Sequence, residues 1–148
     1  MGQVNFKARE MNLLDLPDEI LLLILKKLNV VETLDQQCGF HSQLDRILFD
    51  DIYVRELDWT RKCWDESISS MDGLVIDRVC KNILPRINEK IIELTLEPNS
   101  IERVLHAVHY PKLSSLSLKN FSKKILVEHL TSNVDHFFQS NKYSVSFL

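Results

Sequence analysis

The longest apolar run of the chain lies near its beginning, at Ile20–Leu25. It follows Pro17 and two acidic residues, and two lysines come directly after it. Proline suits the first position of a helix, and the charges at both ends match the helix dipole. We therefore predict a helix that begins at Pro17. Six consecutive apolar residues cover more than one helix face, which predicts one face in the core and another free for a partner.

The alternative for this run is a plain core helix, because apolar side chains are usually buried. A membrane span would need about 20 apolar residues, so the run is too short to cross a bilayer. The residues before it contain no apolar signal-peptide region. We accordingly expect no membrane association.

The second half of the chain alternates apolar and polar residues. Arg55–Trp59, Ile92–Leu96 and Ser115–Leu118 show the period of a half-buried strand, and Tyr143, Val145 and Phe147 predict one more. The chain stops at Leu148, so we expect either a fragment of a longer array or a last strand that pairs elsewhere.

The spacing of these strands is similar to that of leucine-rich repeats. Leu94 and Leu116 are 22 positions apart, within the repeat period of about 20–29 residues. Leu113–Phe121 fits the repeat's core pattern of leucines. This half is therefore interpreted as a short, irregular repeat segment.

Helices are predicted between these strands. Asp72 is a candidate cap for a first helix, which Pro85 ends or kinks. Asn99 is a candidate cap for a second, with Glu102 as its capping-box partner. The first helix has its apolar positions at Leu74, Val75, Val79 and Ile83. The second has them at Ile101, Val104, Leu105 and Val108. A third, short helix is predicted over Lys124–Leu130.

The first part of the chain resembles the F-box family. Leu16–Leu28 is similar to the family's first helix, and Val31–Leu34 to the turn and start of its second. Cys38–Leu48 stands at the family's third stretch, with Phe40 and Leu44 at positions usually held by valine and an aromatic residue. Gly39 weakens that segment as a helix. Phe49–Arg55 resembles the aromatic exit, so the resemblance covers about residues 13–56.

This resemblance implies a small helical bundle that docks onto a Skp-type adaptor protein. Through that adaptor the chain would join a cullin–RING ubiquitin ligase, and its C-terminal part would recruit a protein substrate. A bundle this small buries little surface, so a partner would supply part of its burial. By analogy, the adaptor contacts would be Leu16, Pro17, Ile20, Leu21, Ile24, Leu28 and Leu34.

The expected fold class is α+β, mostly α. We divide the chain into a flexible N-terminus (1–12), an F-box-like helical bundle (13–56) and a short leucine-rich-repeat-like α/β segment (57–148), which would be truncated if the array continues. The 148 residues are 45% hydrophobic and 26% charged, which is a globular composition.

Charge and cysteine content exclude some classes of partner and of site. The net charge is −3 and the pI about 5.9, which disfavours nucleic acid as a partner. Three cysteines without C-x-x-C spacing argue against a disulfide framework or a zinc site. They suit a reducing compartment, so we expect a cytoplasmic or nuclear location.

Trp59 and Trp64 flank a basic pair, a pattern that can stack on a nucleic acid base but in an acidic domain more often marks a packing edge between two subdomains.

No catalytic motif, phosphate loop or cofactor fingerprint is present in the sequence. His106 and His109 are three apart, but a solvated helix face is the simpler interpretation of this pair. We expect no enzyme activity, no metal and no cofactor. The leading hypothesis is the ligase adaptor, and the alternative is a non-catalytic leucine-rich-repeat interaction protein without a ubiquitin role.

Overall fold

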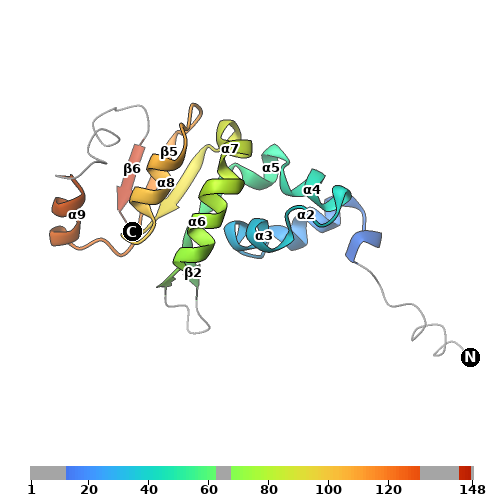
Figure 1. Ribbon diagram of the computed structural model, residues 1–148, viewed down its shortest axis with the longest axis horizontal. Helices are drawn as coiled ribbons and strands as arrows, with labels where there is room; N and C mark the ends of the chain where they lie inside the picture. The colour runs from blue at the N-terminus through green and yellow to red at the C-terminus, as the bar shows by residue number, and fades with distance from the viewer. Residues whose placement is uncertain (1–12, 63–67, 131–143, 148) are drawn as a thin grey trace, which may run out of the picture.

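The computed structural model describes residues 13–62, 68–130 and 144–147. Figure 1 shows an elongated molecule with a helical bundle at one end and a sheet with covering helices at the other. The predicted flexible segment 1–12, the side chain of Trp64 and the proposed strand residue Tyr143 lie outside the described residues.

The N-terminal end consists of short helices joined by tight turns. A 3₁₀ turn, η1, precedes the four α-helices, and the five elements are η1 (Leu13–Asp15), α2 (Asp18–Lys26), α3 (Val30–Gln37), α4 (Ser42–Leu48) and α5 (Asp51–Val54). Each α-helix buries apolar side chains on its inner side, such as Leu21 in α2 and Leu48 in α4. Residues 13–54 therefore form a predominantly helical region with an apolar interior.

The other end is built on a four-stranded sheet in which all neighbouring strands are parallel. Its strands, in spatial order, are β1 (Glu56–Asp58), β4 (Glu93–Leu96), β5 (Ser115–Leu118) and β6 (Ser144–Phe147). The predicted strands are thus confirmed. Leu94 pairs in register with Leu116, so the spacing of 22 residues corresponds to one step across the sheet.

Helices and a small hairpin connect these strands. The hairpin is antiparallel, and the connecting elements are β2 (Thr60–Lys62), β3 (Ile68–Ser70), α6 (Gly73–Asn82), α7 (Leu84–Ile87), the 3₁₀ turn η2 (Asn88–Lys90), α8 (Ile101–Ala107) and α9 (Lys123–Leu130). Helices α6 and α8 lie together over one face of the sheet (Figure 1). With more helix than strand, the fold confirms the α+β, mostly α class.

The alternation within each strand separates the two faces of the sheet. Leu57, Leu94 and Leu116 point into the core, whereas Glu56 and Glu93 are exposed. The buried residues form one continuous cluster that runs from Leu21 in the bundle to Leu118 in the sheet. The bundle and the sheet therefore share a single core.

Two local predictions about helix starts were wrong. Pro17 precedes α2 with an extended ψ of 151°, and its carbonyl accepts hydrogen bonds from the N–H groups of Ile20 and Leu21. Asn99 is not the N-cap of α8, because the helix begins at Ile101; the Asn99 amide donates to the carbonyl of Met71 at 3.1 Å. Ser100 occupies the position before α8, without a side-chain capping bond.

Other local predictions are confirmed. The carboxylate of Asp72 accepts from the N–H of Leu74 at 2.9 Å and caps α6. Pro85 lies in the first turn of α7, so the chain kinks between α6 and α7. Gly39 lies in the turn between α3 and α4 with φ of +91°, which glycine adopts at little cost. The prediction that Gly39 weakens a helix was wrong, because Gly39 lies in the turn and belongs to neither α3 nor α4.

Candidate functional site

Helix α2 has an apolar surface on the side that faces away from the core. Leu21 and Leu25 are buried, whereas Ile20, Leu23 and Ile24 are 42%, 60% and 38% exposed. These three positions follow the i, i+3, i+4 pattern of one helix face. Just beyond the helix, Leu28 is 53% exposed. We call Ile20, Leu23, Ile24 and Leu28 the apolar stripe.

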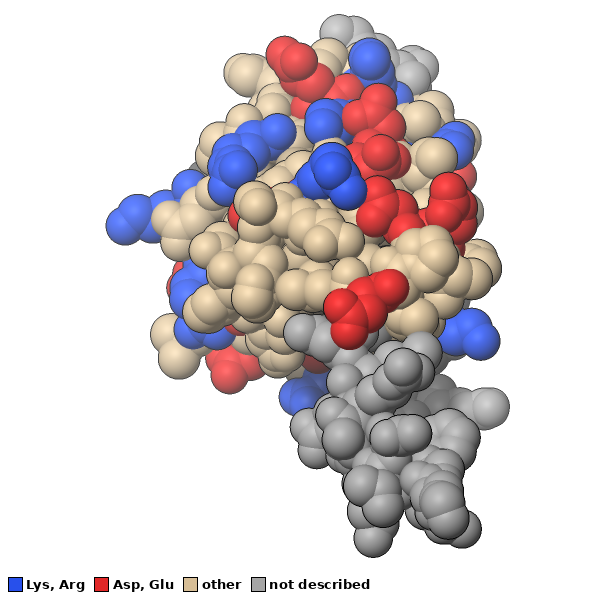
Figure 2. Space-filling model, turned by 90° about the vertical axis from the view of Figure 1, so that its right-hand side faces the viewer, with Lys and Arg blue, Asp and Glu red and all other residues tan. Residues whose placement is uncertain are grey.

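Figure 2 shows the bundle end of the molecule, with a broad uncharged area bordered by basic and acidic side chains. Soluble proteins rarely expose several large apolar side chains side by side unless the surface binds something. The apolar stripe is therefore the first candidate site.

The structure separates the predicted adaptor contacts into two groups. Pro17, Ile20, Ile24 and Leu28 are exposed, and Leu16 is half-buried. Leu21 and Leu34 are both fully buried, so in this conformation they support the bundle from inside and present no surface to a partner.

Leu23 was missed by the sequence analysis, although it lies three residues after Ile20 and thus on the same face. Phe40, in the turn after α3, is also highly exposed and was not among the predicted contacts. The spacing within the run could have identified Leu23. Nothing in the local pattern indicates that Phe40 points outward.

Contacts from the rest of the bundle position α2. The hydroxyl of Tyr53 donates to the carbonyl of Leu25 at 3.3 Å, inside the core. On the surface, Arg46 of α4 donates to the carboxylate of Asp18 at 2.8 Å. Because both ends of the helix are tied to neighbouring helices, its outward face is presented in a defined orientation.

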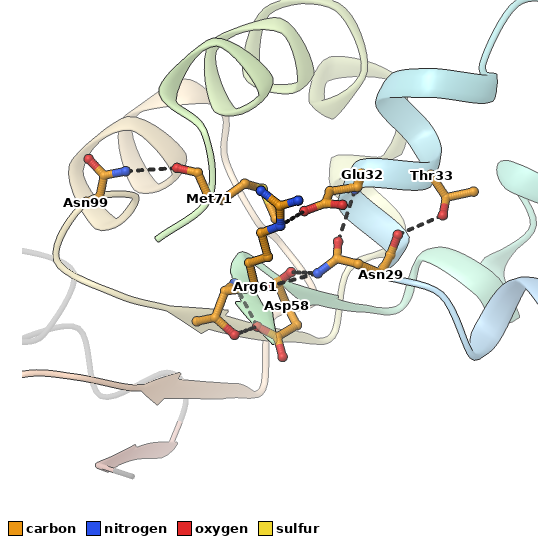
Figure 3. A network of polar contacts seen from close by, with 8 residues as sticks. Asn29, Glu32, Thr33, Asp58, Arg61, Met71 and Asn99 are labelled. Atoms are coloured by element: carbon orange, nitrogen blue, oxygen red, sulfur yellow. Dashed lines mark hydrogen bonds and ion pairs between the residues drawn. The ribbon is translucent and has the colours of Figure 1, made fainter. Parts of the chain in front are cut away.

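The joint between the bundle and the sheet is centred on Asn29 (Figure 3). Its side-chain oxygen accepts from the N–H of Glu32 and caps α3, while its amide donates to the carbonyls of Asp58 and Thr60, at 3.3 and 2.9 Å. The guanidinium of Arg61 faces the Glu32 carboxylate at 3.6 Å. One asparagine thus joins the start of α3 to strands β1 and β2.

Further contacts hold the same joint on its other side. Arg78 of α6 makes two hydrogen bonds to the carboxylate of Asp35 in α3, at 2.8 and 2.7 Å. The ammonium of Lys90 donates to the carbonyl of Phe49 at 2.6 Å, and the Arg86 guanidinium lies 4.2 Å from the Phe49 ring centre. These contacts restrict rotation of the bundle relative to the sheet.

Trp59 lies fully buried between β1 and β2, within the core that the bundle and the sheet share. Within the described residues its indole N–H has no hydrogen-bond partner. Burial of this donor costs some stability, so packing of the ring must compensate for it.

A cleft of about 720 Å³ opens beside this joint. One wall is the turn from α2 to α3, and the floor is the open face of the sheet at β1 and β4. Most of its lining residues are polar or charged: Lys26, Lys27, Leu28, Asn29, Val30, Glu32, Glu56, Leu57, Asp58, Thr60, Arg61, Glu93 and Thr95. It is the second candidate site.

A buried carboxylate lies after the end of β4. Glu97 is only 2% exposed, and burial raises its pKa. Hydrogen bonds from the Ser70 hydroxyl, the Met71 N–H and Asn120 act in the opposite direction. Because these partners come from separate segments of the chain, Glu97 joins the ends of β3, β4 and β5.

The described cysteines and histidines form no chemical site. Burial raises the pKa of Cys38, and raises that of Cys80 to about 12, so neither is a ready thiolate nucleophile. His106 and His109 are both exposed, and His109 lies beyond the end of α8. Among the described residues, no three His, Cys, Asp or Glu side chains lie close enough to hold a metal ion.

In the part of the chain that the structure covers, no helix has the length and apolar content that a bilayer crossing requires. Comparison with known proteins adds no assignment, since no protein-family model and no curated protein matches the chain. The assignment of a role to either candidate site therefore rests on the geometry of that site.

Proposed function

We propose that this chain is an F-box-type adaptor that links a protein substrate to a Skp–cullin ubiquitin ligase. The observation that carries the proposal is the apolar stripe on α2, which directly follows the Leu16-Pro17 motif. The stripe belongs to a helix that is buried on its opposite side and held at both ends. A Skp-type adaptor would cover it.

The energetics favour a protein partner for this surface. Covering a partly exposed leucine or isoleucine contributes about 1 kcal/mol per side chain. Four such side chains supply a hydrophobic centre of the kind found in stable interfaces, with the exposed Asp18, Glu19 and Lys26 at the ends of α2 as part of a polar rim. The sheet and its covering helices lie on the far side of the joint, where they would present a surface to the substrate.

The test is co-expression with a Skp-type adaptor, followed by size-exclusion chromatography of the complex. Leu23→Asp and Ile24→Asp should each abolish co-elution, because a charge would be desolvated in an apolar contact. Leu74→Asp is the matched control: Leu74 is 65% exposed but lies on α6, away from the stripe. This variant should co-elute as the wild type does.

Point variants are a better control here than deletion of residues 1–56. The deletion would remove the bundle's share of the common core, so loss of binding could reflect unfolding. A folded wild-type chain that ignores the adaptor would contradict the proposal. It would support the alternative, a non-catalytic leucine-rich-repeat interaction protein without a ubiquitin role.

A further inference from the structure

The cleft beside the joint continues onto the open face of the sheet as two rows of side chains. In register across the strands, one row is Glu56, Glu93, Ser115 and Ser144, and the other is Asp58, Thr95, Ser117 and Ser146. We call them the glutamate row and the aspartate row. Both rows consist of charged or hydroxyl side chains.

The folded chain itself satisfies the charge in the aspartate row. The carboxylate of Asp58 accepts from the N–H and hydroxyl of Thr60, at 2.9 and 2.6 Å, and lies 3.7 Å from the ammonium of Lys119. Nearby, Arg61 pairs with Glu32. These groups therefore stabilise the joint and are not free for a ligand.

The glutamate row differs in this respect. Glu56 and Glu93 are both exposed, lie opposite each other on adjacent strands, and form no ion pair with any described residue. Like charges directly opposite each other on a sheet are destabilising. The fold therefore gains nothing from this pair, whereas a cationic ligand placed between the two carboxylates would.

The far wall of the cleft has the opposite charge. Lys26 and Lys27 lie at the C-terminal end of α2, where the helix dipole favours cations, so the fold accounts for their presence. They would repel a uniformly basic ligand. A complementary ligand therefore has a cation over the sheet and an anion towards the α2–α3 turn.

We propose that the cleft binds an extended segment of a protein partner, with one Lys or Arg side chain between Glu56 and Glu93 and an acidic residue facing Lys26 and Lys27. The open shape and the continuing hydroxyls of the glutamate row suit a peptide. Identifying this partner as the ligase substrate rests on the proposed function. The binding mode itself depends only on the cleft.

The probe is a positional-scanning library of short synthetic peptides, applied to the purified full chain. One position should select Lys or Arg. The double variant Glu56→Gln/Glu93→Gln should bind the selected peptide about tenfold more weakly, because a charge-assisted contact is lost. The control Glu89→Gln changes an exposed glutamate in η2, outside the cleft, and should bind as the wild type does.

The charge reversal Glu93→Lys separates a binding role from a structural one. It removes the repulsion with Glu56, so the melting temperature should rise while binding of the basic peptide is lost. The preference for a basic residue should disappear, because the introduced lysine would pair with Glu56 and neutralise the site. Absence of any basic preference in the wild type, or an unchanged preference in the double glutamine variant, would overturn the proposal.

Failure of this proposal can be distinguished from failure of the proposed function. Leu23→Asp should lose the Skp-type adaptor and keep the peptide preference, whereas the double glutamine variant should do the reverse. A wild-type chain that selects basic peptides but ignores the adaptor would overturn the ligase role alone.

Discussion

The outward face of α2 and the open face of the sheet both carry exposed side chains on elements whose opposite sides are buried, yet their chemistry differs. The α2 face is a stripe of leucine and isoleucine. The sheet face consists of carboxylates and hydroxyls. Water solvates the second surface well and the first poorly.

This difference indicates two kinds of partner. An apolar surface gains from any well-fitting cover in proportion to the area buried, which suits a stable complex. A polar surface gains only where charges match, which gives specificity more than affinity. We therefore expect a permanent partner on α2 and a selective, weaker one at the sheet.

The largest expected effect on stability comes from placing a charge on the buried side of α2, compared with the same change on its exposed side. Leu21→Asp places a charge in the core, and we expect a loss of about 4 kcal/mol or more in the free energy of unfolding. Leu23→Asp should change it by less than about 1 kcal/mol. Urea unfolding followed by circular dichroism checks both values. Equal losses would mean that the stripe is not a free surface.

A smaller effect tests whether the bundle and the sheet unfold together. Leu34→Ala creates a cavity in the bundle part of the core and should cost about 2–5 kcal/mol. Tryptophan fluorescence and circular dichroism should give coincident transitions, since the core is continuous. Leu74→Ala, at an exposed position, is the control. Two separate transitions would show that the two parts are independent.

The hydrogen bonds at the Asn29 joint should contribute less to the free energy of unfolding than the core residues do. Asn29→Ala removes a helix cap and two hydrogen bonds to the strands, with an expected cost of about 1–2 kcal/mol. Asn29→Ser keeps a capping oxygen but cannot reach the carbonyls of Asp58 and Thr60. Its stability should lie between those of the alanine variant and the wild type. A serine variant as stable as the wild type would mean that the bonds across the joint contribute nothing.

The smallest effect is the pH dependence at Glu97. Burial raises its pKa, so the protonated form favours the folded state. The stability linked to this proton is present below the unfolded pKa of about 4.5 and is lost as the pH rises through the folded pKa. Glu97→Gln should thus melt higher than the wild type at pH 7, and the difference should shrink towards pH 4. A difference independent of pH would contradict this.

Much of the fold could be predicted because its signals are local. The alternation at Ile92–Leu96 and Ser115–Leu118 predicts strands, since side chains on a strand point to opposite faces in turn. Asp72 caps α6 through a contact two residues away. The apolar run Ile20–Leu25 predicts a helix with apolar residues on both sides.

The tertiary structure alone decided which side of that helix is buried. Leu21 and Leu23 are both leucines in one run, and only the packing of α3 and α4 against α2 distinguishes them. Asn99 has the sequence of a cap, but the Met71 carbonyl, distant in sequence, is its partner. The Asn29 joint likewise joins residues about 30 positions apart.

The chain therefore determines by itself where its helices and strands lie, because periodicity and capping act within a few residues. Which surfaces remain free is decided only when distant segments pack together. The apolar stripe, the pairing of Glu56 with Glu93 and the burial of Glu97 all arise in this way, since each depends on neighbours far away in sequence.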